Sequence, residues 1–218
     1  MNKTQLQNST ERLSRLTWNQ LEQVLAVPSR PQPPIYFFLS KKSEGSLKGR
    51  SLYEIDLVHR QQFYGEGITL KHPPCAWVSR LDQVPEETGH LFALTYQLST
   101  KKYAKATELT APQELWSMTL HECFGQFASQ LIVGLGPIPS RPKKRMRQPN
   151  ELWRAAHEEG YYLASKLSRA FFDELVSPEK IKKWFRLNWY QQDKPTALLF
   201  LYELLNESAP TPDFKKIF

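Results

Sequence analysis

Proline-containing runs break the chain of 218 residues into short pieces and limit how far any helix or strand can extend. The runs SRPQPP (29–34) and SRPKKRMRQP (140–149) are two such breaks. Proline lacks the backbone N–H that a helix interior needs, and it disfavours helix in the residue before it. Regular structure is therefore expected between these runs and not across them.

Hydrophobic periodicity in the first half predicts one helix followed by a sheet. Thr17 can cap a helix over 18–27, in which Leu21, Val24 and Leu25 share one face. An earlier turn around Leu6, Leu13 and Leu16 is a candidate extension of this helix. Four to five strands are expected next, at 35–39, within 51–63, after Gly67, from Cys75 and over 91–98, separated by turn signals such as HPP and PEETG. Strands without helices between them favour an antiparallel sheet.

The second half carries helical patterns. Capping residues and apolar spacing predict helices over 111–133, over 151–176, from Pro178 and from Pro195. The expected fold class is α+β, with an N-terminal helix, an antiparallel sheet of four to five strands and a mainly helical C-terminal half. The predicted organisation is an α+β domain (1–136), a basic Pro-rich linker (137–149), a helical domain or subdomain (150–207) and a tail (208–218).

Positive charge gathers in two short segments. The net charge is +7, yet residues 40–50 hold four basic side chains and one acidic one, and residues 140–150 hold five basic and no acidic ones, so the rest of the chain nets −1. Both segments lack hydrophobic periodicity and are rich in Ser, Gly or Pro, which predicts loops. Mobile Lys and Arg side chains can follow a phosphate backbone and release its counterions. A solvated loop is the alternative interpretation.

A third basic feature is an amphipathic helix that begins at Pro178. Its aromatic and apolar arc consists of Ile181, Trp184, Phe185 and Trp189, and its basic stripe of Lys182, Lys183 and Arg186. The arc is expected to anchor the helix while the stripe faces outwards, and a solvated surface is again the alternative. After the sharp break before it, this helix can be the second of a helix-turn-helix-like pair.

These features favour a non-enzymatic protein that associates with nucleic acid, either DNA or RNA. A regulatory role is one form that this function can take. The expected phosphate contacts are Arg141, Lys143, Lys144, Arg145, Arg147, Lys182, Lys183 and Arg186, with Lys41, Lys42, Lys48 and Arg50 as a second patch. The alternative is a protein–protein adaptor, a homo-oligomer or a structural subunit of a larger assembly. That alternative rests on the segment TALLFLYELL, which is apolar nearly all round.

Motif searches predict no catalytic residue, no metal site and no cofactor. The stretch GSLKGRS (45–51) has one residue too few between its glycines for a phosphate-binding loop, and Arg50 stands where that loop has lysine. None of the five histidines pairs with another at a metal-ligand spacing. A site that gathered two or more of His121, Cys123, His157, Glu54 and Asp56 would indicate an enzyme instead.

Cysteine content and hydropathy predict a cytoplasmic, reducing location without membrane contact. Cys75 and Cys123 are too few for a disulfide scaffold and are expected to be reduced and buried, with a single bridge as the alternative. The first fifteen residues lack the apolar core of a signal peptide, and the longest apolar run, 197–202, is far shorter than a membrane span. The stretch PKKRMR (142–147) resembles a nuclear import signal, which would direct a eukaryotic protein to the nucleus.

Overall fold

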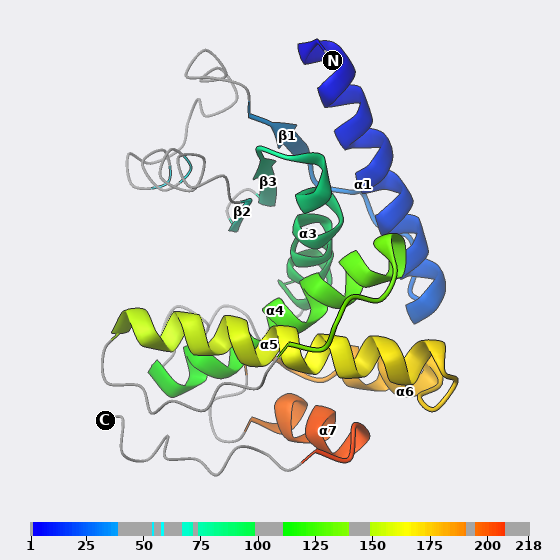
Figure 1. Ribbon diagram of the computed structural model, residues 1–218, viewed down its shortest axis with the longest axis vertical. Helices are drawn as coiled ribbons and strands as arrows, with labels where there is room; N and C mark the ends of the chain where they lie inside the picture. Colours follow the sequence, from blue (N-terminus) through cyan, green and yellow to red (C-terminus); the bar gives the residue numbers. More distant parts are fainter. Residues whose placement is uncertain are drawn as a thin grey trace.

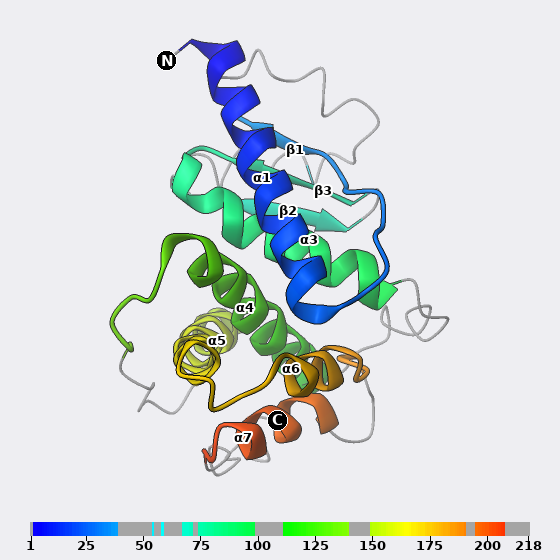
Figure 2. The same ribbon diagram turned by 90° about the vertical axis from the view of Figure 1, so that its right-hand side faces the viewer.

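The structure, a computed structural model, contains six α-helices and a small sheet in the part of the chain that it describes, namely residues 2–38, 54, 58, 67–71, 74–98, 111–139, 149–190 and 195–207. The elements are α1 (Lys3–Leu25), β1 (Ile35–Phe37), β2 (Ile68–Lys71), β3 (Pro74–Val78), the 3-10 turn η2 (Leu81–Gln83), α3 (Val84–Leu98), α4 (Ala111–Val133), α5 (Pro149–Phe172), α6 (Pro178–Phe185) and α7 (Thr196–Leu204). The sheet, α1 and α3 form one half of the molecule, and α4 to α7 form the other (Figure 1, Figure 2). Among the described residues, none of the helices combines the length and apolar composition that a membrane span requires.

The sheet has three strands, so the expected antiparallel sheet of four to five strands is wrong for the described residues. The strand order is β1-β3-β2. β1 runs parallel to β3, with Ile35 opposite Ala76, whereas β2 runs antiparallel to β3, with Ile68 opposite Trp77. Strands are present at three of the five expected places, and the sheet is mixed.

The segment 91–98, which was expected to be a strand, is the second half of α3. Leu91, Phe92, Ala93 and Leu94 are all buried, and a helix that is buried all round shows no periodicity to distinguish it from a buried strand. The stretch PEETG begins this helix instead of forming a turn. Proline is tolerated in a first helical turn, and the positive end of the helix dipole favours the acidic side chains that follow it.

Two further expectations about the first half differ from the structure. Glu54 and Val58, the described residues of the stretch expected to be a strand within 51–63, have helical backbone. The first helix begins at Lys3 rather than at residue 18, because Asn2 and Gln5 form a reciprocal capping box at its start. Thr17 therefore lies inside the helix, where its hydroxyl donates to the carbonyl oxygen of Leu13.

The helices of the second half are close to those expected. α4, α6 and α7 begin within a residue of the predicted positions. α5 ends at Phe172, earlier than the predicted 176, where Glu174 adopts a left-handed backbone conformation with φ of 58°. The amides of Leu175 and Val176 then donate to the carbonyl oxygen of Ala170 and close the helix.

The two faces of the sheet have different cover. Ile35, Phe37, Ala76 and Val78 belong to the cluster of buried residues that α1 and α3 also form, so these two helices cover one face (Figure 2). On the other face Trp77 packs against Tyr36, with ring centroids 4.8 Å apart. Both cysteines are free and buried, as expected.

A second concentration of aromatic rings lies around α4. The ring of Phe124 packs against Phe185, with centroids 4.8 Å apart, and also against Trp184 and Trp189. The main cluster of buried residues runs from Trp18 on α1 to Tyr202 on α7, so residues on both sides of the predicted 137–149 linker contribute to it. Phe124 therefore connects the helices of the second half to this core.

The variant Phe124→Ala is expected to lower the free energy of unfolding by about 3–5 kcal/mol, because it leaves a cavity among these rings. Urea unfolding followed by circular dichroism measures the change. Phe172→Ala is the matched control, since the Phe172 ring is 46% exposed. Equal losses in the two variants would contradict the central position of Phe124.

Candidate metal centre

Glycines bring α3 and α4 into close contact. A Cβ atom placed on Gly89 of α3 would lie 2.7 Å from the Cβ of Ala128 and 2.9 Å from the Cα of Gly125, both on α4. Such distances are shorter than van der Waals contact, so only glycine fits this crossing. The two helix backbones therefore approach more closely than larger side chains would allow.

A glycine also brings α5 close to the other side of α4. A Cβ atom on Gly160 of α5 would lie 2.5 Å from the Cβ of Glu122 and 2.9 Å from the carbonyl oxygen of Thr119. In Figure 2, α4 accordingly runs between α3 and α5. Polar side chains within one turn of these contacts converge from three helices.

Glu86, His90 and Glu122 form a group with the composition and spacing of a metal site. One ligand atom from each of the three lies within 4.8 Å of the others. Glu86 and His90 are one turn apart on α3, which places them on the same face, and Glu122 faces them from α4. Carboxylate oxygens with an imidazole nitrogen suit divalent transition-metal ions, and three protein ligands leave a position for water.

The ring of His90 contacts α4 at two points. A Cβ atom on Gly125 would lie 2.6 Å from Cε1 and 2.7 Å from Nε2 of His90, so the ring rests on the bare backbone of α4. Burial lowers the pKa of His90, although Glu86 and a hydrogen bond with the main chain of His121 oppose that shift. His90 is therefore neutral at pH 7, which is the form that binds metal ions, and its ring has the outer partner typical of metal-bound histidines.

The Glu122 carboxyl group is buried close to the charge of Glu86. Burial, and next the charge of Glu86, raise the pKa of Glu122 from 4.5 to about 8. Glu122 consequently keeps its proton at neutral pH when no cation is bound. Glu87, the neighbour of Glu86, faces the sheet instead and accepts a hydrogen bond of 2.6 Å from the Thr69 hydroxyl, and burial raises its pKa well above the usual value.

Aromatic and histidine side chains surround the three ligands. The Tyr161 hydroxyl donates a hydrogen bond to Glu86 Oε1, and His157 Nε2 lies 3.7 Å from Glu122 Oε2. His121 Nε2 is 2.6 Å from the Tyr190 hydroxyl, and its ring centroid is 6.5 Å from that of His90. α5 and the segment after α6 thus line the site beside α3 and α4.

Two of the five residues whose gathering would indicate an enzyme lie near this group. The ring centroid of His121 is 6.5 Å from that of His90, and His157 Nε2 is 3.7 Å from Glu122 Oε2. Cys123 is buried in the core, which raises the pKa of its thiol and keeps it from acting as a nucleophile. Glu54 has helical backbone, and Asp56 lies outside the described residues.

The sequence itself contains a spacing signal for this site. Glu86 and His90 are separated by four positions, the spacing of neighbours on one helix face. The expectation of a turn at PEETG and a strand over 91–98 concealed this pair. Glu122 lies in the stretch LHEC, which is informative for metal binding only once α3 is known to face it.

Only some of the basic residues predicted to contact phosphates lie in the part of the chain that the structure describes. Arg141, Lys143, Lys144, Arg145, Arg147, Lys41, Lys42, Lys48 and Arg50 lie outside the described residues. On α6, Ile181, Trp184 and Phe185 are buried as expected, while Lys183 and Arg186 are exposed and Lys182 is half-buried. Lys183 Nζ lies 5.4 Å from the centroid of the Phe200 ring on α7. α6 packs chiefly against α1 and α7, and its helix-turn-helix-like pairing with α5 stays a prediction.

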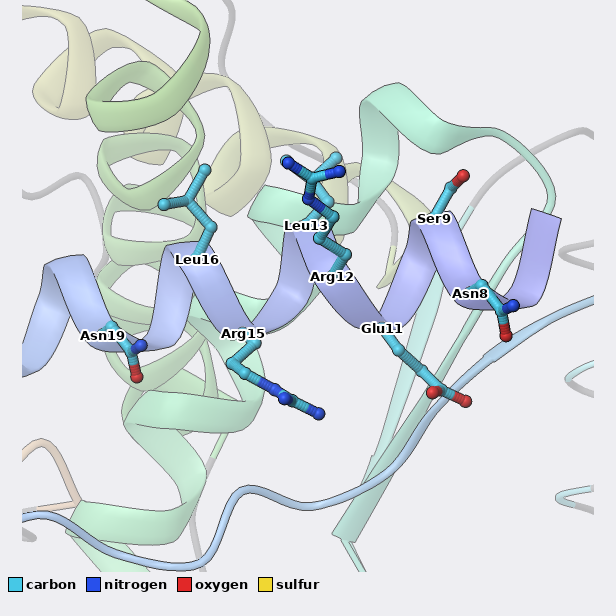
Figure 3. A pocket seen from close by; sticks show the side chains of 8 residues that line it. All are labelled: Asn8, Ser9, Glu11, Arg12, Leu13, Arg15, Leu16 and Asn19. Atoms are coloured by element: carbon cyan, nitrogen blue, oxygen red, sulfur yellow. The ribbon is translucent and has the colours of Figure 1, made fainter. Parts of the chain in front are cut away.

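A shallow hollow on α1 differs in kind from the metal centre. Its described lining residues all belong to α1 and project from both sides of the helix, among them Arg12, Arg15 and Leu16 (Figure 3). One helix supplies no converging groups from a second element. The hollow therefore carries no site.

Replacing Glu122 by Gln is expected to change how stability depends on pH. In wild type without metal, folding raises the Glu122 pKa from 4.5 to about 8, so the folded state loses stability as the pH rises through this window. Glu122→Gln has no proton to lose there. Melting temperatures measured in EDTA from pH 5 to 9 should therefore fall less steeply in the variant. Glu114→Gln, at an exposed position of the same helix, is the control and should follow wild type; parallel curves for all three proteins would contradict the raised pKa.

The sequence matches no protein-family model, and no curated protein or solved structure shows significant similarity to the chain. The chemistry of the candidate metal centre therefore follows from its own residues.

Proposed function

We propose that the protein binds a divalent transition-metal ion between α3 and α4 and uses it to activate water for hydrolysis. The observation that carries this proposal is the convergence of Glu86, His90 and Glu122, whose ligand atoms lie within 4.8 Å of one another. Donors that share one ion at about 2.0–2.2 Å lie at most about 4.4 Å from one another, so binding requires the three side chains to close slightly around the ion. The ligand set mixes oxygen and nitrogen, which suits Zn²⁺, Mn²⁺ or Fe²⁺ better than Ca²⁺.

The electrostatics of the metal-free site support the same proposal. Two carboxyl groups and an imidazole are gathered here, and burial disfavours the charged forms of Glu122 and His90. A divalent cation would replace the proton of Glu122 and neutralise both carboxylates. The site also has a route to solvent, since the side chains of Glu122 and His157 are 15% and 31% exposed.

A second candidate function is the contact with nucleic acid predicted from the charge distribution. One structural observation favours it: α6 buries its aromatic side and leaves Lys183 and Arg186 exposed. A basic protein with a hydrolytic metal centre would combine both functions in one chain, which is an alternative to the non-enzymatic role. The role as an adaptor or subunit stays a prediction, and Leu199 on α7, at 46% exposed, is a point where a partner could pack.

The proposed setting for either function is the cytoplasm. Cys75 and Cys123 are both free and buried in the structure, which agrees with a reducing compartment.

Titration with metal ions tests the proposed centre. Protein stripped with EDTA is expected to bind one Zn²⁺ or Co²⁺ ion per chain by calorimetry, with an affinity that rises about tenfold per pH unit below pH 8, because Glu122 must release a proton. Glu86→Gln, His90→Ala and Glu122→Gln should each weaken binding by more than about 100-fold, since each removes a ligand.

Two variants sharpen this titration. Gly125→Ala keeps all three ligands but places a methyl group against the His90 ring, so it should weaken binding as well. Glu114→Gln, which lies on the exposed side of α4, should bind like wild type. Wild-type affinity in the three ligand variants would reject the proposed site.

Salt dependence tests the second candidate. Wild type is expected to bind mixed-sequence duplex DNA or single-stranded RNA with an affinity that falls steeply with salt, by a slope of about 0.7–0.9 per phosphate contacted. Changing Lys143, Lys144, Arg145 and Arg147 together to Gln, or Lys183 and Arg186 together to Gln, should reduce that slope. Binding without a salt slope, or the same slope in all proteins, would contradict a phosphate contact by these residues.

A further inference from the structure

One face of α1 is exposed along most of the length of the helix. The side of α1 that bears Thr17, Leu21 and Leu25 is buried, and the sheet, α3 and α4 lie behind the helix in Figure 2 and Figure 3. On the outward side, exposed residues with long polar side chains recur at spacings of four, three and four positions. They are Asn8, Arg12, Arg15 and Asn19, which we call the α1 stripe. With about 3.6 residues per turn, these positions lie within an arc of about 60°.

The side chains of the α1 stripe take no part in holding the fold together. Within the described part of the chain, none of them makes a hydrogen bond or an ion pair. Gln7, on the flank of the same helix, differs in this respect. Its amide donates to the carbonyl oxygen of Ile35 and accepts from the backbone N–H of Phe37, so it joins α1 to β1. The stripe is left available to a partner.

The composition of the stripe is unfavourable for the helix by itself. Asparagine is a poor helix former, because its side chain competes for backbone hydrogen bonds, whereas Ala, Glu, Lys and Gln suit exposed helix positions. Asn8 and Asn19 obtain no compensating hydrogen bond from the described residues. Residues that break a local rule without a structural return indicate a functional surface. A merely solvated face does not account for this choice of residues.

Arginine and asparagine are the side chains that pair through two hydrogen bonds with single bases of duplex DNA. The guanidinium fork donates to O6 and N7 of guanine, and the asparagine amide both donates to and accepts from adenine. Arg12 and Arg15 also belong to a chain of net charge +7, which favours association with a polyanion. The acidic neighbour Glu11 accepts a hydrogen bond of 2.8 Å from Gln7, which holds its carboxylate on the β1 side of the helix.

The dimensions of α1 fit the major groove of B-form DNA. A helix with its side chains is about 10–12 Å across, and the groove is about 12 Å wide. From Asn8 to Asn19 the stripe extends about 16 Å along the helix, or about five base-pair steps. Arg12 and Arg15 extend towards opposite sides of the exposed face in Figure 3, so they can reach different base pairs. No deep hollow is needed, because the helix itself enters the groove.

We propose that α1 is a recognition helix that enters the major groove of duplex DNA, where Arg12 and Arg15 contact guanines and Asn8 and Asn19 contact adenines. This inference deepens the second candidate function and rests on it, although it uses different residues from the basic segments and α6. Those basic residues would contact phosphates, which fixes position, while α1 supplies sequence preference. DNA is favoured over double-stranded RNA, because the major groove of an RNA helix is too deep and narrow for side chains to read.

Selection from a pool of duplex DNA with about ten randomised base pairs tests this role, with EDTA present so that the metal centre does not contribute. Wild type is expected to enrich a site that contains both G·C and A·T pairs. At equal salt it should bind the enriched duplex at least about 100-fold more tightly than a scrambled duplex of the same composition.

Two double variants separate base contacts from charge. Arg12→Lys with Arg15→Lys keeps both charges but removes both guanidinium forks, so the preference for the enriched duplex should fall by about tenfold or more. Its affinity for the scrambled duplex and its salt slope should stay within about twofold of wild type. Asn8→Ala with Asn19→Ala should lose the preference at the A·T pairs and melt at a higher temperature, because alanine is the better helix former. Arg154→Lys, at an exposed arginine of α5, is the control and should match wild type.

The outcomes distinguish this inference from the function on which it rests. If wild type binds no nucleic acid, the second candidate function fails and the inference fails with it. If wild type binds all DNA duplexes alike, or the lysine variant keeps the wild-type preference, α1 does not read bases, whereas contact with phosphates still stands. Tighter binding to a double-stranded RNA than to the enriched DNA would also overturn the major-groove contact.

Discussion

The close approach of α3 and α5 to α4 is the constraint on which the rest of the arrangement depends. Helices usually keep their axes 8–10 Å apart, because side chains fill the space between them. At Gly89 and Gly160 the helix backbones approach without a side chain between them, and at Gly125 the His90 ring lies against the bare backbone. The position of the His90 ring against Gly125 follows directly from this. A methyl group at any of these three positions would move a helix or a ligand.

The polar interior that results disfavours charged side chains. Burial raises the pKa of Glu87 and Glu122 and lowers that of His90, so each group favours its neutral form. The aromatic rings around Phe124 and the apolar cover of the sheet supply the stability that the polar group does not. Proteins retain such unfavourable sites where activity requires them.

The sequence predicts the amphipathic and capped elements well and the buried ones poorly. α6 has a clear apolar arc, and Ile181 and Trp184 are buried as the pattern indicates. α3 is buried all round, so its sequence carries no period that separates helix from strand. The error about α3 also hid the site: four residues span about 6 Å along a helix but about 13 Å along a strand, so only a helix brings Glu86 and His90 together.

Glu122 was beyond prediction for a different reason. Its relation to Glu86 and His90 is set by the contact between α3 and α4, and no local pattern encodes which face of one helix meets which face of another. The glycines that determine this contact are ordinary residues in the sequence. Their role in helix packing can be recognised only when the neighbouring atoms are known.

The distribution of the three ligands over α3 and α4 has a mechanical consequence. α3 packs on the sheet, whereas α4 is the central helix of the other half of the molecule (Figure 1). An ion held by both helices, as proposed, would therefore cross-link the two halves. Release of the ion would weaken the contact between α3 and α4. Amide hydrogens along these helices would then exchange with solvent through local opening, before the whole chain unfolds. The state of the ion would in this way set how firmly the two halves are joined.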